Sequence, residues 1–160
     1  MTQVLVSIGS NIDPRKHIQA ALAALQDTFG ELTCSSIYET QAVGFAGPAF
    51  HNLAVRFATD QSAEDVNATL KRIEQTLGRP SEGPKFGDRC IDLDLILYGQ
   101  QQCESETLCL PRAELTEQAF VLGPATEIAG EWVHPVNGQS LASLWVAMGE
   151  TLKPSESAPC

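Results

Sequence analysis

Two aspartates alternate with apolar residues in a run that reads as a strand, residues 89–99. Because residues two apart on a strand point to the same face, Asp92 and Asp94 should face one way and Ile91, Leu93 and Leu95 the other, toward a core. Adjacent carboxylates repel each other, and burying either one unpaired is costly. A positive group should therefore lie between them: Arg89, just before the strand, could supply part of it, and a divalent cation is the other candidate, for which oxygen ligands near phosphates favour magnesium. The alternative is an edge strand with both acids in water.

The basic residues are concentrated around this pair. The formal net charge is -10, yet six of the ten Lys and Arg lie between positions 71 and 112: Lys71, Arg72, Arg79, Lys85, Arg89 and Arg112. A basic island in an acidic chain favours a small anionic ligand that binds with its metal, although some of these charges are expected to be ordinary solvated ones. The overall acidity argues against nucleic acid as a partner.

Length and composition predict one domain over residues 1–152, followed by a disordered tail over residues 153–160. No apolar run approaches the about 20 residues of a membrane span, and no charged start precedes an apolar one. The five cysteines form no CxxC pair, which predicts free thiols in a reducing compartment rather than disulfides. We therefore expect a cytoplasmic protein that does not bind membranes, and we expect a monomer.

The elements that must position the aspartates follow the order β-α-β-β-α-β. Strands are expected at residues 3–8, 32–40, 52–58 and 89–99, with helices between Asp13 and Gly30 and between Ser62 and Gly78, where Asp13 and Ser62 are the expected caps. This order predicts an α+β fold with a ferredoxin-like antiparallel sheet, helices on one side and C-terminal additions. The additions are a short strand at 108–111, a helix over 116–128, a turn at 134–138 and a helix over 140–148.

Two long loops, residues 41–51 and 79–88, should lie at the same end of the sheet as the Asp pair. The first loop carries Phe45 and Phe50, and phenylalanine can stack on a flat heterocycle. Arginines of the basic island can bind phosphate bidentately. Metal, phosphate and aromatic ring together favour nucleotide-dependent phosphoryl chemistry, although the chain contains neither GxxxxGK[ST] nor GxGxxG.

Four segments, in order, carry a resemblance to one enzyme family. They are Ser7-Ile8-Gly9-Ser10-Asn11; Tyr38-Glu39-Thr40 with Gly44, Pro48, Phe50 and Asn52; Leu77-Gly78-Arg79 with Gly87, Arg89 and Ile91-Asp92-Leu93-Asp94-Leu95; and Phe120-Val121-Leu122 with Pro124, Glu127-Ile128-Ala129 and His134-Pro135. Over about residues 3–145 the chain resembles the 6-hydroxymethyl-7,8-dihydropterin pyrophosphokinases of folate biosynthesis, which transfer pyrophosphate from ATP to a pterin alcohol.

The resemblance implies a role for each matching residue. Asp92 and Asp94 would hold two magnesium ions. The pterin would lie between Phe50 and Phe120, and its hydrogen-bonding edge would be read by Asn52, Thr40 and Val43. ATP would contact Glu74, Arg79, Arg89 and Arg112. The residues alone leave other interpretations open. Phe120 is equally a core residue, Asn52 a strand terminator and Glu74 a helix-surface acid, and His134 is expected to shape a turn.

Four positions depart from the family pattern. Arg112 stands where the family usually has histidine, Gln118 and Ser81 where it has arginine, and Phe86 where it has tryptophan. One lost charge-assisted contact in a dry site is worth roughly 2–4 kcal/mol. The sequence therefore predicts a pyrophosphokinase, with a weakened paralogue that binds pterin or nucleotide without efficient transfer as the alternative.

Overall fold

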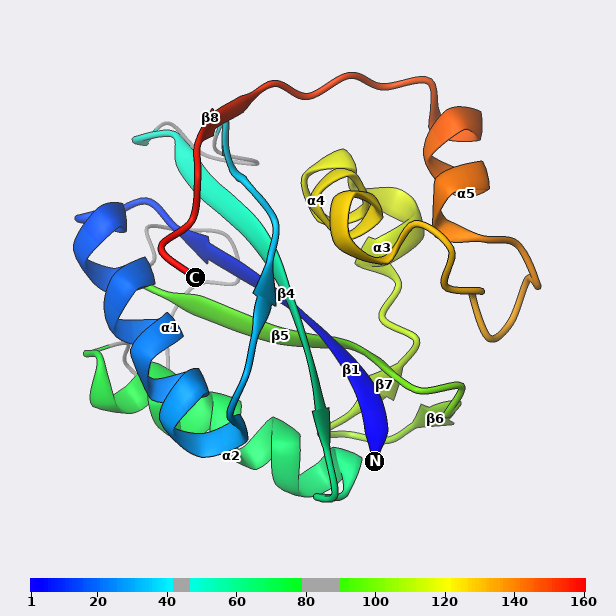
Figure 1. Ribbon diagram of the computed structural model, residues 1–160, viewed down its shortest axis with the longest axis horizontal. Coiled ribbons are helices and arrows are strands. Elements are labelled where there is room, and N and C mark those ends of the chain that lie inside the picture. Colours follow the sequence, from blue (N-terminus) through cyan, green and yellow to red (C-terminus); the bar gives the residue numbers. More distant parts are fainter. Residues whose placement is uncertain (42–46, 79–89) are drawn as a thin grey trace.

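An antiparallel sheet forms the centre of the computed structural model, which describes residues 1–41, 47–78 and 90–160. In this part of the chain the sheet has six strands, in the order β5-β1-β4-β3-β8, with β2 also paired to β4 (Figure 1). The strands are β1 (Thr2–Ser10), β2 (Thr33–Cys34), β3 (Ile37–Thr40), β4 (Phe50–Thr59), β5 (Asp92–Tyr98) and β8 (Pro154–Glu156). The predicted α+β class and antiparallel sheet are thus confirmed.

Strands β1 and β4 form the middle of the sheet and pair from Thr2↔Thr59 to Ser10↔His51. Strand β5 pairs with the other side of β1 and is the last strand on that side. The strand predicted at 32–40 is divided into β2 and β3 by Ser35, whose Oγ accepts a hydrogen bond from the Ala54 N–H at 2.8 Å. The side chain thus replaces one rung of the ladder.

Helices α1 (Pro14–Phe29) and α2 (Ala63–Thr76) cover one face of the sheet (Figure 1). Their buried residues pack against the alternate apolar positions of β1, β4 and β5. Ser62 caps α2 as predicted, because its Oγ accepts from the Asp65 N–H at 3.1 Å. Asp13 does not act as the predicted cap: its backbone is left-handed, at φ 42 and ψ 54, and its side chain makes no capping hydrogen bond.

The opposite face carries α3 (Glu114–Glu117), α4 (Ala119–Ala129) and α5 (Leu141–Met148) around a second core (Figure 1). The expectation of helices on one side therefore holds only for α1 and α2. The helix predicted at 116–128 is also two helices. Gln118 separates them with an extended backbone, φ -118 and ψ 121, and Thr116 lies inside α3 rather than capping a helix.

A small second sheet joins β6 (Cys103–Glu104) to β7 (Cys109–Leu110), the latter within the strand predicted at 108–111. Asn67 of α2 holds this hairpin by donating to the Thr107 carbonyl at 3.2 Å. After β7 the chain passes beside β5, where the Arg112 N–H donates to the Ile96 carbonyl at 3.1 Å. This pairing brings the Arg112 side chain next to the aspartates.

The last residues of the chain differ from the predicted disordered tail. Strand β8 pairs with the edge strand β3, and Ser155 Oγ donates to the Ile37 carbonyl at 3.0 Å. A disulfide joins Cys34 to Cys160, whose Cα atoms are 6.0 Å apart, so the prediction of free thiols does not hold for these two residues. Cysteine spacing could not reveal this pair because it forms across a sequence separation of 126.

Within residues 1–41, 47–78 and 90–160, no helix combines the length and the apolar character needed to cross a bilayer.

Candidate functional site

The two aspartates lie on edge strand β5, opposite Gly9 and Ser7 of β1. Leu93 and Leu95 between and after them are buried, with 0% and 2% exposure, and belong to the core under α1 and α2. The alternation therefore directs both carboxylates to the other face, as the sequence predicts. Burial of the apolar side fixes this register, because a slip by one residue would place the acids in the core.

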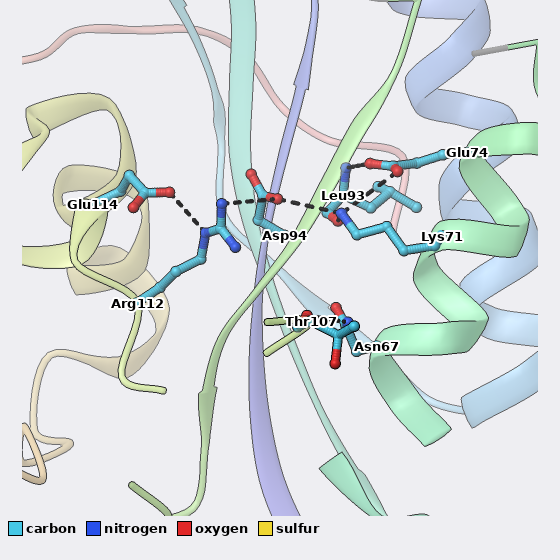
Figure 2. Close-up of polar contacts among 8 residues, drawn as sticks. All are labelled: Asn67, Lys71, Glu74, Leu93, Asp94, Thr107, Arg112 and Glu114. Carbon is cyan, nitrogen blue, oxygen red and sulfur yellow. Dashed lines mark hydrogen bonds and ion pairs between the residues drawn. The ribbon is translucent and has the colours of Figure 1, made fainter. Parts of the chain in front are cut away.

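Two side chains of α2 form hydrogen bonds with backbone groups on the edge of β5 that faces away from β1. Glu74 Oε2 accepts from the Leu93 N–H at 2.6 Å, and Lys71 Nζ donates to the Leu93 carbonyl at 3.1 Å (Figure 2). An edge strand otherwise leaves such groups without protein partners. Glu74 is only 4% exposed. Glu74 is thus not a helix-surface acid but a buried hydrogen-bond acceptor for the backbone N–H of Leu93 at the edge of β5.

Two cations meet one oxygen of Asp94. Lys71 Nζ lies 3.5 Å and Arg112 Nη2 3.7 Å from Asp94 Oδ1 (Figure 2). Each cation is held by a second acid: Arg112 Nε is 2.7 Å from Glu114 Oε2, and Lys71 Nζ is 3.5 Å from Glu74 Oε1. We call this alternating series the charge chain; it consists of Glu114, Arg112, Asp94, Lys71 and Glu74.

The charge chain balances two opposing effects on Asp94. Burial and, after it, the charge of Asp92 raise the pKa of the Asp94 carboxyl above its ordinary value, while Arg112 and Lys71 work against that rise. Burial lowers the pKa of Arg112, but Asp94 and Glu114 outweigh it and leave that pKa above its ordinary value. A further cation at Asp94 would favour the ionised carboxylate, which burial and the charge of Asp92 disfavour.

The donor set near the aspartates suits magnesium bound together with phosphates. Among residues 1–41, 47–78 and 90–160, no group of three or more His, Cys, Asp and Glu is arranged to hold a metal ion. Magnesium is commonly bound by one or two carboxylates, with water and substrate phosphates completing its shell. Asp92 and Asp94 fit that pattern, whereas a metal site built from protein ligands alone does not fit the described residues.

A second group of predicted residues lies on the same face, on β3 and β4. Asn52, 3% exposed, donates from Nδ2 to Thr40 Oγ1 at 2.6 Å. Asn52 pairs in register with Gly9, where an added Cβ would lie 3.1 Å from Asn52 Oδ1 and 3.7 Å from Phe50 Cδ1. Asn52 therefore lies inside β4 rather than ending a strand, and glycine at position 9 allows both side chains to approach the backbone.

The predicted aromatic residues come from different elements. Phe50 is the first residue of β4, and Phe120 is the second of α4, where it packs partly buried against the second core. Helix α4 is fixed to β3 by Glu127, which accepts hydrogen bonds from the Tyr38 hydroxyl and from the Ser36 N–H, the latter at 2.8 Å. Stacking of a ring between Phe50 and Phe120 remains a prediction.

Sequence reasoning assigned no role to two buried polar residues at the end of β1, Ser10 and Asn11. Ser10 Oγ donates to the Cys90 carbonyl at 2.5 Å, next to the start of β5. Asn11 Nδ2 donates to the Pro48 carbonyl at 3.2 Å, next to the start of β4. These residues therefore hold the segments that lead into Asp92 and Phe50. The sequence signal was the Gly-Ser-Asn turn, which by itself is common.

Several predicted residues lie outside the described part of the chain. They are Val43, Arg79 and Arg89, together with the departures at Ser81 and Phe86. Of the remaining departures, Arg112 belongs to the charge chain, and Gln118 is the residue before α4.

Comparison with known proteins identifies the family. Residues 5–130 match the family model described as 7,8-dihydro-6-hydroxymethylpterin-pyrophosphokinase (HPPK). The chain is 38% identical over 143 residues to the 2-amino-4-hydroxy-6-hydroxymethyldihydropteridine pyrophosphokinase of Synechocystis, covering 88% of this chain and 73% of that protein. It is also 38% identical over 143 residues to the folic acid synthesis protein fol1 of Pneumocystis carinii, with 88% of this chain covered.

Some of these relatives are much longer than this chain. The match spans 19% of the Pneumocystis protein and 30% of a folate synthesis bifunctional protein of Arabidopsis thaliana, to which the chain is 30% identical. Among solved structures, Plasmodium falciparum HPPK-DHPS aligns with a TM-score of 0.71 at 12% identity, over 92% of this chain and 44% of that one. That likeness concerns the fold alone. The sequence match over residues 5–130 and the 38% identity to a pyrophosphokinase of comparable length show that this chain belongs to the HPPK family.

Proposed function

We propose that this chain transfers pyrophosphate from ATP to the hydroxymethyl group of 6-hydroxymethyl-7,8-dihydropterin and releases AMP. The observation that carries the proposal is the placement of Asp92 and Asp94 on the same face of the sheet as Asn52, Thr40 and Phe50. Two carboxylates that could bind metal thereby share a face with polar and aromatic side chains that could bind the pterin, and this supports transfer between two bound substrates. The family assignment supports the same activity.

In this mechanism the pterin hydroxyl oxygen attacks the β-phosphorus of ATP and releases its proton to solvent, and the bond from that phosphorus to the oxygen shared with the α-phosphorus breaks, so that this oxygen leaves with AMP. Asp92 and Asp94 would hold two magnesium ions, whose positive charge would offset the negative charge of the phosphates. Arg112, aimed by Glu114, offers its guanidinium to a phosphate oxygen. Asn52, oriented by Thr40, reads the hydrogen-bonding edge of the pterin between Phe50 and Phe120. Positioning and charge compensation supply most of the rate.

Other parts of the proposal rest on the sequence. Arg79, Arg89 and Val43 are assigned to phosphate and pterin through the resemblance, and Glu74 would act on the nucleotide only through β5.

The order β5-β1-β4-β3 supports the ferredoxin-like topology. A single domain, a monomer, a cytoplasmic location, and no nucleic acid or membrane partner stay predictions.

Chromatographic detection of AMP tests the activity directly. We expect AMP to form from ATP only when both the pterin alcohol and magnesium are present. An Asp94→Asn variant should abolish this AMP, whereas Asp60→Asn, which changes an exposed acid after β4, should not. If concentrated protein released no AMP above background, the proposal would be wrong, and the alternative of binding without transfer, which the relatives do not support, would need calorimetric tests with the pterin.

Gln118→Arg tests the departure at the residue before α4. The residue precedes α4 and its Phe120, and an arginine there would add a positive charge near the phosphates. Because one charge-assisted contact in a dry site is worth roughly 2–4 kcal/mol, we expect kcat to rise about 30-fold or more. Gln139→Arg, in the turn before α5, is the matched control. Equal kcat values for the wild type and Gln118→Arg would show that this position does not limit transfer.

A further inference from the structure

Lys71 is the one member of the charge chain that no argument above includes in the reaction. It extends from α2 to the edge of β5, where Nζ lies 3.1 Å from the Leu93 carbonyl, 3.5 Å from Glu74 Oε1 and 3.5 Å from Asp94 Oδ1. Its side chain is 41% exposed. The ammonium therefore compensates a predicted metal ligand while it remains open to solvent.

The two cations beside Asp94 are not held equally firmly. Arg112 makes a 2.7 Å contact with Glu114, and its backbone N–H is bonded to the Ile96 carbonyl. The Lys71 ion-pair contacts are both 3.5 Å, and a lysine ammonium rotates on a flexible stem. Lys71 can thus leave Asp94 while its helix stays in place, whereas Arg112 is fixed by two partners.

A divalent cation at Asp94 would compete with Lys71. Both charges need the same carboxylate, and a dication a few ångströms from an ammonium is strongly repelled in a partly buried site. Binding of the metal alone leaves the ammonium with only Glu74 and the Leu93 carbonyl. Binding of the metal with a triphosphate supplies new anionic partners for the ammonium.

We propose that Lys71 is a positioning residue that neutralises Asp94 until magnesium arrives bound to a nucleotide, and that its ammonium then moves from Asp94 to a phosphate oxygen. The exchange makes the site bind the metal–nucleotide complex in preference to the free ion. This inference rests on the proposed function, because it takes the metal and the triphosphate from that reaction.

The exchange predicts two opposite effects of one substitution. Lys71→Gln removes the competing charge, so the free ion should bind about tenfold more tightly. The same variant lacks the cation that receives the phosphate, so the metal–nucleotide complex should bind about tenfold more weakly. A residue with a merely structural role would not move the two affinities in opposite directions. Lys71→Arg keeps the charge and should stay near the wild type in both.

The experiment titrates the 160-residue chain with Mn²⁺ alone, followed by electron paramagnetic resonance, and with magnesium–ATP by calorimetry, without the pterin. Arg72→Gln is the matched control, since Arg72 is the next residue of α2 and donates to Thr69 Oγ1 at 3.4 Å. Thermal melts verify that each variant is folded. If Lys71→Gln leaves Mn²⁺ affinity unchanged or lowers it, or leaves magnesium–ATP affinity unchanged, the exchange is refuted. If wild-type protein binds no magnesium–ATP at all, the proposed function fails instead.

Discussion

Glu74 shows how a single side chain can connect the core to the site. Its carboxylate is buried and accepts from the Leu93 N–H, between the two aspartates. Glu74→Ala leaves this N–H without its acceptor, and we expect a loss of about 2–3 kcal/mol in the free energy of unfolding. Glu74→Gln retains an acceptor oxygen and should cost about 1 kcal/mol or less. Urea denaturation measures both losses.

The control for this prediction is Gln75→Ala, an exposed position on the same helix. It should leave the urea midpoint within experimental error of the wild type. Should Glu74→Ala lower ATP affinity and leave stability unchanged, the direct nucleotide contact implied by the resemblance would be favoured over the role at the strand edge.

Gly9 sets the distance between β1 and the predicted pterin-binding residues. Because a Cβ at this position would approach Asn52 Oδ1 to 3.1 Å, Gly9→Ala should displace the amide by a few tenths of an ångström. We expect the KM for the pterin to rise about tenfold, with a smaller change in kcat. The double variant Gly9→Ala/Asn52→Ala completes a cycle, and its KM should be no higher than that of Asn52→Ala alone. Independent, additive effects would show that Gly9 does not act through Asn52.

At the residue scale, the sequence predicted side chains whose role follows from local alternation. Asp92 and Asp94 are two apart on a strand, so their common face needs no tertiary information. The roles of Glu74 and Lys71 depend on where α2 meets the edge of β5, a contact between elements that alternation does not reveal. Ser10 and Asn11 were missed for the same reason, because their partners are distant in sequence.

At the scale of elements, the turn between α4 and α5 depends on the protonation state of His134. The ring is buried, and Nδ1 accepts from the N–H groups of Val136 and Asn137 at 3.2 and 3.3 Å. Burial lowers the pKa of His134 from its ordinary 6.5. The folded state thus favours the neutral ring, which contributes stability above pH 6.5 that is lost as the pH falls through the lower, folded-state pKa.

We expect the free energy of unfolding to decrease between pH 6.5 and the folded-state pKa, with a slope of up to about 1.4 kcal/mol per pH unit from this group. In His134→Asn the side-chain oxygen can still accept within the turn, but nothing titrates. Urea unfolding of the two proteins at several pH values isolates the histidine, since the other titrating groups are shared. A constant difference between the two curves across this range would contradict the assignment.

The helices on the second face explain another limit of the sequence. Thr116 as a cap, followed by the apolar residues from Ala119 to Leu122, predicted one helix over 116–128, but the extended backbone of Gln118 divides this stretch into α3 and α4. The division directs α4 across the sheet, where Glu127 contacts Tyr38 and Ser36. Periodicity within a helix carries no information on such a change of direction, whereas the order of β1, α1, β4, α2 and β5 follows from local patterns and turn residues.

At the scale of the whole molecule, the C-terminal strand β8 forms the edge of the sheet next to β3. Strand β8 pairs with the edge of β3, which carries Thr40. Glu156 Oε2 of β8 lies 3.2 Å from Arg15 Nη2 of α1. Polar, proline-containing composition suggested disorder, because composition does not show which distant edge a short segment will meet. The contact between Glu156 and Arg15 is exposed and contributes little by itself. The covalent link is therefore expected to dominate the attachment of this segment.

Removing the Cys34–Cys160 disulfide should accordingly destabilise the chain. The link spans a sequence separation of 126, and constraint of the unfolded chain by a loop of this length is worth about 2–5 kcal/mol. We expect Cys160→Ser, or treatment with dithiothreitol, to lower the free energy of unfolding within this range and to speed amide exchange along β3. Cys109→Ser, which changes an exposed free cysteine, is the control and should match the wild type. Mass spectrometry should first show that Cys34 and Cys160 are linked before reduction. If the urea unfolding curves with and without reductant then superimpose, β8 is held by its backbone and side-chain contacts alone.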